Sequence, residues 1–250
     1  MRLKDRVAFV TGGSGGLGQA IAERFLEEGA FVVVADIDAA RLEAMVASST
    51  AEAGRLTSVI LDVSDYDKVK AAIDKVVDDF GRLDILVNNA GFSPKKNWLD
   101  YSIAEWKQVI DVNLSGEYYG ARAVAEHMME RQQGRIINLS SSAWRHGGVS
   151  GGGGVPYTSS KAGIIGLTRS LAKALGAYNV TVNAIAPGYT DTDMVSAVPA
   201  NVLEKIVAKI PVGRLGKAEE IGRGVMFLIA DDAGFITGST LSINGGQHMY

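Results

Sequence analysis

Short apolar segments alternate with longer amphipathic segments along the whole chain, and this alternation limits it to few architectures. Seven segments are apolar without a strict polar–apolar alternation, as expected of strands that are covered on both faces. They are residues 6–12, 31–36, 56–62, 83–89, 134–140, 180–187 and 239–245. Helical patterns lie between them, at residues 17–28, 65–81 and 105–134. This order predicts a single open parallel sheet with helices on both faces.

The chain is predicted to form a single domain over residues 1–250, because no linker, internal repeat or change of composition divides it. The glycine cluster at 147–154 lies inside this domain and is interpreted as a loop. Residues 189–215 are rich in apolar and small residues and contain two prolines. They are predicted to form two short helices that act as a lid over a substrate pocket.

The composition argues against several classes of function. The net charge of −3 is weakly acidic, which argues against a nucleic-acid partner because phosphate binding needs a basic surface. The chain has no cysteine, so it has no disulfide, thiolate nucleophile or cysteine-ligated metal, and no metal site is predicted. It contains no apolar run of about 18 residues and no signal-peptide pattern. No membrane partner is therefore predicted, and the expected location is the cytoplasm.

A glycine-rich turn, TGGSGGLG at residues 11–18, joins the first predicted strand to the first predicted helix. Glycines let a backbone turn sharply and approach a pyrophosphate closely. The N–H groups at the start of the following helix, together with its dipole, favour negative charge there. A structural turn is the alternative, but the strand before it and the amphipathic helix after it favour a dinucleotide site.

Asp36 ends the second predicted strand, 18 residues after Gly18. A carboxylate at this place accepts hydrogen bonds from an adenosine ribose and repels a 2′-phosphate. No Lys or Arg occurs in the glycine turn or between Asp36 and Arg41. The charges therefore favour NAD over NADP, and the alternative is a solvent-facing acid at a strand end.

Tyr157 and Lys161 stand four positions apart, directly after the glycine cluster. This spacing places both side chains on one face of a helix. An ordinary surface pair explains the spacing equally well when it is considered alone.

Seven motifs together resemble the short-chain dehydrogenase/reductase family over essentially the whole chain. They are TGGSGGLG at 11–18, LDVSD at 61–65, NNAG at 88–91, the Asn of VNLSG at 113, GRIINLSS at 134–141, YTSSK at 157–161 and PGYTDT at 187–192. The resemblance implies an α/β, doubly wound (Rossmann-type) domain with a seven-stranded, mainly parallel sheet. It also implies a nicotinamide cofactor, and in most members a homotetramer.

The resemblance assigns four catalytic residues, namely Asn113, Ser141, Tyr157 and Lys161. Tyrosine is a poor base at neutral pH, but a nearby ammonium and a positive nicotinamide ring favour the phenolate. Tyr157 is then the general acid/base, and Lys161 also reaches the nicotinamide ribose. Ser141 holds the substrate oxygen, whereas its neighbours in the strand point elsewhere. Asn113 opens a kink in the long helix and holds a water that links Lys161 to solvent.

The motifs also assign the binding residues. The cofactor set is Gly12, Ser14, Gly16, Leu17, Gly18, Asp36, Asp62, Val63, Asn89, Ala90, Gly91, Tyr157, Lys161, Pro187, Gly188, Thr190 and Thr192. The substrate set is Ser141, Trp144, His146, Tyr189 and Met194. The chain departs from the family at Thr190, where Ile or Val is more frequent, and in the longer loop before Tyr157.

The predicted function is hydride transfer between NAD(H) and a secondary alcohol or its ketone. A 3-oxoacyl-thioester (acyl carrier protein) reductase is the first alternative, although such enzymes usually use NADP, which Asp36 disfavours. A non-catalytic nucleotide-binding regulator is the second, although such a protein needs no serine–tyrosine–lysine set. The identity of the small-molecule substrate is left open.

A homotetramer is expected because two helices carry more apolar residues than one buried face needs. These residues include Tyr118, Tyr119, Ile164 and Ile165. In the family, the corresponding two helices form a four-helix contact between subunits, with two-fold symmetry.

Overall fold

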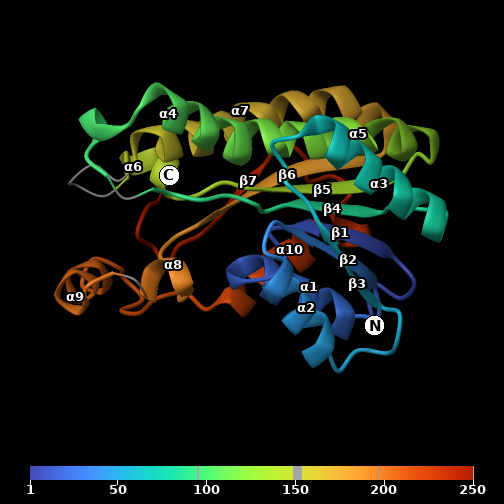
Figure 1. Cartoon of the computed structure of the whole chain (residues 1–250), viewed down its shortest axis with the longest axis horizontal. Helices are drawn as coiled ribbons and strands as arrows, with labels where there is room; N and C mark the ends of the chain where they lie inside the picture. Colours follow the sequence, from blue (N-terminus) through green and yellow to red (C-terminus); the bar gives the residue numbers. More distant parts are fainter. Residues whose placement is uncertain (95, 149–153, 197, 250) are drawn as a thin grey trace.

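The seven predicted strands form one parallel sheet in a computed structural model that describes residues 1–94, 96–148, 154–196 and 198–249. The strand order is β3-β2-β1-β4-β5-β6-β7 (Figure 1). The strands are β1 Val7–Thr11, β2 Phe31–Asp36, β3 Leu56–Ile60, β4 Ile85–Asn88, β5 Gly134–Leu139, β6 Val180–Pro187 and β7 Thr240–Ile243. This is the doubly wound sheet that the sequence predicts, so the predicted fold class is confirmed.

Helices cover both faces of the sheet (Figure 1). The α-helices are α1 Gly16–Glu27, α2 Ala39–Ser48, α3 Tyr66–Phe80, α4 Ile103–Ile110, α5 Gly116–Glu130, α6 Ala143–His146, α7 Val155–Leu175, α8 Asp193–Ser196, α9 Ala200–Val207 and α10 Ala218–Leu228. Short 3₁₀ turns cover Trp98–Asp100, Gly176–Tyr178 and Asp231–Ala233. In Figure 1, α1, α2 and α10 lie on one side of the sheet, and α3, α5 and α7 lie on the other.

Each face of the sheet carries its own hydrophobic core, because side chains alternate along a strand. In β1, Val7 and Phe9 point into the core under α3 and α5, whereas Ala8 and Val10 point into the core under α1 and α10. All four are buried, which explains why the strand reads as a continuous apolar run.

The predicted helix over 105–134 is wrong in one respect, because it is not continuous. A π-helical turn, Asp111–Ser115, separates α4 from α5. Asn113 lies in this turn, and its side chain bonds both the N–H and the carbonyl of Phe92, at 3.0 and 2.9 Å. An extra residue in one helical turn is typical of functional sites. The kink predicted at Asn113 therefore takes the form of a π turn.

Segment 189–215 contains two short helices, as predicted, namely α8 and α9. Two of the residues expected at a subunit interface lie elsewhere. Ile164 and Ile165 are buried within the single chain, which makes them core residues of α7 and unavailable to a partner subunit. Tyr118 on α5 is 45% exposed, in agreement with the expectation for that residue.

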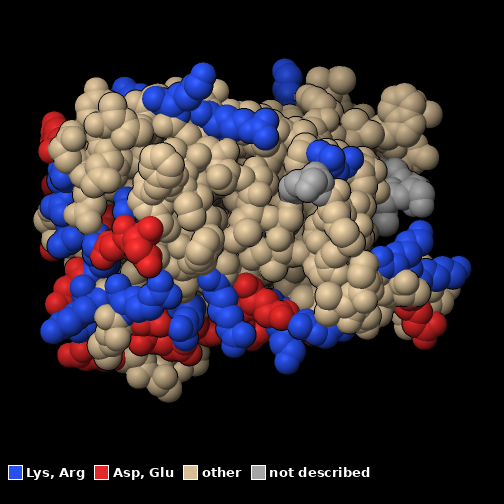
Figure 2. Space-filling model, turned by 180° about the vertical axis from the view of Figure 1, so that it is seen from behind, with Lys and Arg blue, Asp and Glu red and all other residues tan. Residues whose placement is uncertain are grey.

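Figure 2 shows acidic and basic side chains intermixed at one end of the rear face, while the centre of that face is largely uncharged. Of the helices in the described part of the chain, none is long and apolar enough to cross a membrane.

A buried carboxylate joins the amino ends of β1 and β4. Asp84, 1% exposed, accepts hydrogen bonds from the Val7 N–H at 2.9 Å and from two nitrogens of Arg82 at 2.7 Å each. The guanidinium of Arg131 approaches it to 3.8 Å. The carboxylate in turn raises the pKa of Arg82. This one carboxylate therefore pairs with Arg82, faces Arg131, and ties two central strands together.

Asp84→Asn is expected to lower the free energy of unfolding by about 2–4 kcal/mol, because breaking one partner of a buried pair strands the other charge. Urea unfolding monitored by circular dichroism measures the change. The matched control is Asp79→Asn, in an exposed pair with Lys75, which is expected to cost less than about 0.5 kcal/mol. Equal effects of the two substitutions would contradict the prediction.

Candidate active site

A cavity of about 710 Å³ opens at the carboxyl ends of the strands. Residues that follow β1, β2, β3, β4, β5 and β6 all line it. β1 pairs with β2 on one side and with β4 on the other, so the chain reverses its direction of winding at this point. Ligands of doubly wound sheets bind at such a switch point.

The glycine turn forms one wall of the cavity, and its geometry requires glycine. Gly12 has φ +60°, in the left-handed region. A Cβ on Gly18 would lie 2.1 Å from the Gly12 carbonyl oxygen, so no larger residue fits there. The amide of Asn89, directly after β4, donates to the carbonyls of Thr11 and Gly12 at 3.0 and 2.9 Å and fixes the turn.

The start of α1 faces the same wall. Its N-cap is Gly15, and no described side chain caps it. The first N–H groups of a helix then remain available to an anion, and the helix dipole favours one. The turn therefore fits the pyrophosphate of a dinucleotide.

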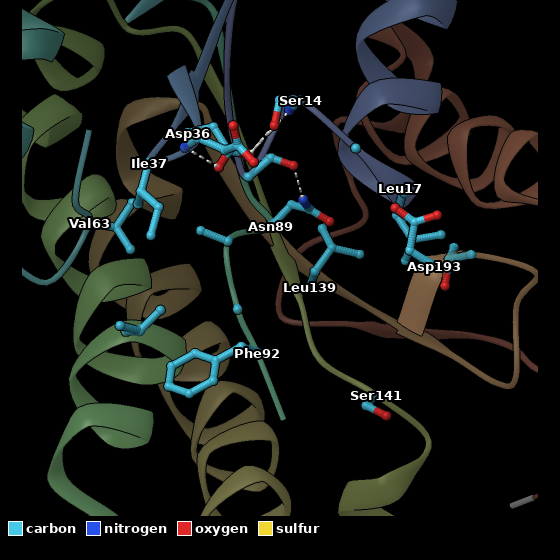
Figure 3. A pocket seen from close by; sticks show the side chains of 18 of the residues that line it. Ser14, Leu17, Asp36, Ile37, Val63, Asn89, Phe92, Leu139, Ser141 and Asp193 are labelled. Atoms are coloured by element: carbon cyan, nitrogen blue, oxygen red, sulfur yellow. Dashed lines mark hydrogen bonds between the residues drawn. The ribbon is translucent and has the colours of Figure 1, made fainter. Parts of the chain in front are cut away.

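Asp36 lies at the far end of the cavity from Ser141 (Figure 3). Its Oδ2 accepts from the Ser14 hydroxyl at 2.7 Å and from the Ser14 N–H at 3.2 Å. Its Oδ1 accepts from the Asp38 N–H at 3.2 Å. These bonds fix the orientation of the carboxylate where it lines the cavity.

Arg41 also lines the cavity, which the sequence analysis missed. Its Nη1 lies 3.0 Å from an oxygen of Asp193 on α8 and 2.9 Å from where a Cβ on Gly15 would be. The sequence shows no Lys or Arg within the glycine turn itself, but the fold brings Arg41 of α2 next to Gly15 of that turn. The signal was Asp38, whose side chain caps α2 and so places Arg41 in the first turn beside the cavity.

Tyr157 and Lys161 both line the cavity from the first turns of α7. The Lys161 Nζ lies 5.9 Å from the centre of the Tyr157 ring. Lys161 is buried, and its Nζ donates to the carbonyl of Leu139 at the end of β5. Its own carbonyl accepts from the Ser140 hydroxyl at 2.7 Å, which locks α7 to β5. The pair is therefore built into the interior and is not a surface pair.

Of the three serines after β5, Ser140 and Ser142 are buried, whereas Ser141 is half-buried. The Ser141 hydroxyl accepts only a 3.2 Å bond from the Ala143 N–H among the bonds recorded for it, and it lines the cavity. Ser140 also lines the cavity, although its hydroxyl is bonded to the Lys161 carbonyl, and the substrate role of Ser141 stays a prediction.

Asn113 lies behind the cavity wall and is fully buried. A Cβ on Gly91 would lie 3.2 Å from the Asn113 Oδ1 and 3.5 Å from the Lys161 Nζ. Asn113 and Lys161 therefore meet at the backbone of Gly91. The side chain of Asn113 is held by Phe92 and by Ser160, at 3.3 Å.

Most of the predicted cofactor set lines this one cavity. The members that line it are Gly12, Ser14, Gly16, Leu17, Asp36, Asp62, Val63, Asn89, Ala90, Gly91, Tyr157, Lys161, Pro187, Gly188, Thr190 and Thr192. Gly18 lies beneath Gly12 instead. Residues that the sequence analysis missed include Ile37, Phe92, Gln108 and Val112. Ile37, Phe92 and Gln108 lie outside the seven motifs, and Val112 lies in VNLSG, where only Asn113 was assigned a role.

The predicted substrate residues are less well gathered. Trp144, His146 and Tyr189 do not line the described cavity, and the side chain of Met194 lies outside the described part of the chain, as do residues 149–153 of the glycine cluster. Burial, and to a lesser extent the charge of Tyr157, raise the pKa of Tyr189. His146 stacks on His248, with ring centres 4.4 Å apart. The substrate roles of these residues stay predictions.

The described residues contain no group of three or more His, Cys, Asp or Glu that could hold a metal ion. Near Tyr157, the cavity presents the phenol of Tyr157, the amine of Lys161 and the hydroxyl of Ser141.

Comparisons with known proteins agree with this geometry. The family model described as Enoyl-(Acyl carrier protein) reductase matches residues 12–248. An acetoacetyl-CoA reductase from Rhizobium meliloti is 44% identical over 246 residues, which cover 98% of this chain and 99% of the relative. The (2S)-[(R)-hydroxy(phenyl)methyl]succinyl-CoA dehydrogenase subunit BbsD from Thauera aromatica is 39% identical over 250 residues, which cover 100% of this chain and 99% of the relative. A crystal structure of a short chain dehydrogenase from Bacillus anthracis matches with a TM-score of 0.89 and 32% identity, covering 99% of this chain and 98% of that one.

Proposed function

Because the chain belongs to the short-chain dehydrogenase/reductase family and is an oxidoreductase, we propose that it transfers a hydride between NAD(H) and a secondary alcohol or its ketone. The observation that carries the proposal is the Tyr157–Lys161 pair, which lines the same cavity as Ser141 and the glycine turn. A nicotinamide cofactor, when bound, supplies or accepts the hydride.

The residues of the chain move and hold the proton. In the oxidising direction Tyr157 takes the proton from the alcohol oxygen, and in the reducing direction it returns one. The Lys161 ammonium favours the phenolate form, because an opposite charge nearby stabilises an anion. The Ser141 hydroxyl holds the substrate oxygen and orients it towards Tyr157. Asn113 supports Lys161 from behind the cavity.

The cofactor is proposed to be NAD, with the pyrophosphate on the glycine turn and the adenosine ribose at Asp36. The fixed orientation of the Asp36 carboxylate supports this assignment. The rest of the predicted cofactor set completes the site in this proposal.

A 3-oxoacyl-thioester reductase is the second candidate. Acetoacetyl-CoA, named for the Rhizobium meliloti relative, is a ketone carried on a thioester, and the matching family description also names an acyl carrier protein. The two candidates share the Tyr157 chemistry and differ in what occupies the outer part of the pocket, under the proposed lid at 189–215.

An assay of NADH oxidation with acetoacetyl-CoA, ethyl acetoacetate and a panel of small ketones tests both candidates. Turnover of any of these ketones with NADH is the expected result. A kcat/KM for acetoacetyl-CoA that is at least about tenfold above that for ethyl acetoacetate, a difference of about 1.4 kcal/mol, would favour the thioester substrate. NADH binding without turnover of any ketone would overturn the proposal in favour of a non-catalytic regulator.

We further propose a homotetramer in the cytoplasm. Exposed aromatic residues on α4 and α5, Trp106 and Tyr118, support an interface there, whereas Ile164 and Ile165 give no support.

A further inference from the structure

A buried carboxyl group lies directly behind the catalytic lysine. Glu117, on the first turn of α5, is 2% exposed, and its Oε1 lies 3.7 Å from the Lys161 Nζ. This separation is short enough for an ion pair but too long for a hydrogen bond. Glu117 does not line the cavity, so Lys161 stands between it and the substrate site.

The surroundings of Glu117 do not satisfy an ionised carboxylate. Among the described residues, neither Glu117 oxygen has a hydrogen-bond partner. The neighbouring Asn88 donates its Nδ2 to the Glu117 backbone carbonyl at 3.1 Å, and its own Oδ1 is also a buried acceptor without a donor. Buried acceptors that lack donors are costly, and a protonated carboxyl supplies a donor.

Two opposing influences act on the proton of Glu117. Burial raises its pKa well above the ordinary value of 4.5, and the positive charge of Lys161 opposes that rise. Lys161 is the charged side chain recorded against Glu117 in the described part of the chain, whereas β4 presents the neutral amide of Asn88. The charge of Glu117 and the charge of Lys161 are therefore coupled.

We propose that Glu117 is a positioning residue of the reaction, whose carboxyl gains and loses a proton beside Lys161 and thereby sets how strongly Lys161 favours the phenolate of Tyr157. When the Glu117 carboxyl is protonated, Lys161 acts on Tyr157 with its full charge. When the Glu117 carboxyl has lost its proton, the carboxylate offsets part of that charge. This inference rests on the proposed roles of Tyr157 and Lys161.

The pH profile of alcohol oxidation tests the proposal. Glu117→Gln keeps the shape of the side chain and removes the titrating group. It is expected to move the midpoint of the acid limb to lower pH by about one pH unit, because no carboxylate then offsets Lys161. Glu117→Asp retains a carboxyl and is expected to bring the midpoint back towards that of the wild type. The matched control is Glu126→Gln, on the exposed side of α5, which should leave the profile unchanged.

An unmoved midpoint in a folded Glu117→Gln variant would overturn the proposal. If the wild type turns over no alcohol or ketone at all, the proposed function is overturned instead. The two failures are therefore distinguishable. Infrared difference spectra provide a readout that does not depend on activity. The band of a protonated carboxyl should disappear with rising pH, and in Lys161→Met it should persist to higher pH. A band that titrates identically with and without Lys161 would also refute the coupling.

The same group predicts a pH dependence of stability. A pKa raised in the folded state means that Glu117 costs more stability as the pH rises above the unfolded value near 4.5. The free energy of unfolding of the wild type is therefore expected to fall relative to that of Glu117→Gln between pH 5 and pH 8. Urea unfolding of both proteins at the two pH values measures this difference, and a constant difference would show that Glu117 does not titrate in the fold.

Discussion

Tyr157→Phe is expected to reduce turnover by about 10²–10⁴-fold, the usual worth of a general acid/base, while NADH binding is retained. The substitution removes the hydroxyl that exchanges a proton with the substrate oxygen, and it keeps the ring beside Lys161. The position of Tyr157 on the cavity wall, with its ring centre 5.9 Å from the Lys161 Nζ, motivates the expectation.

Steady-state kinetics and NADH fluorescence titration measure the two quantities separately. Tyr118→Phe is the matched control, because it removes a phenol hydroxyl from a 45% exposed side chain on α5. Turnover of Tyr157→Phe within about fivefold of the wild type, far below an acid/base contribution, would remove Tyr157 from the mechanism.

The wild-type protein is expected to prefer NAD over NADP by roughly 10²-fold or more in kcat/KM. Loss of charge-assisted hydrogen bonds costs about 1.5–3 kcal/mol, and about 1.4 kcal/mol corresponds to a factor of ten. Repulsion between the Asp36 carboxylate and a 2′-phosphate adds to this cost. Asp36→Ser is expected to relax the preference, mainly by removing the repulsion.

Arg41 makes the test sharper, because its guanidinium lies beside the same end of the cavity. The Arg41 guanidinium forms ion pairs with the carboxylates of Asp193, at 3.0 Å, and Asp38, at 3.6 Å, and these carboxylates already offset its charge. Arg41→Ala in the wild type is therefore expected to change the preference little, whereas in the Asp36→Ser background it should reduce the use of NADP. Kinetics with both cofactors decide the matter, and equal use of NADP by the wild type would refute the role of Asp36.

The central strands were predictable because both faces of the sheet are covered there, so β1, β4, β5 and β6 are buried along their whole length and are apolar runs in the sequence. The positions of the glycine turn and Asp36 at the cavity were predictable for a related reason, since both follow directly after or at the end of a strand that the sequence marks. Local pattern and tertiary structure agree at these positions.

Other features depend on contacts between distant segments and were not predictable. A kink at Asn113 was expected from the family resemblance, but its form as a π turn involves bonds to the backbone of Phe92, 21 residues away. Glu117 reads as an ordinary acid in a helix, and only the packing of α7 against α5 buries it beside Lys161. Arg41 reaches the cavity because of the way α2 is oriented in the fold. Tyr189 lies in the loop between β6 and α8, where side-chain placement has no periodic signal.

The position of β1 between β2 and β4 has a consequence for synthesis of the protein. The bond from Val7 to Asp84 spans 77 residues, so the inner edge of β1 cannot be paired until β4 has left the ribosome. Until then β1, β2 and β3 present an unpaired, apolar strand edge to the solvent. Contacts of such long range slow folding, and exposed edges promote association between chains. The nascent chain is therefore expected to expose this edge between the emergence of β1 and the emergence of β4.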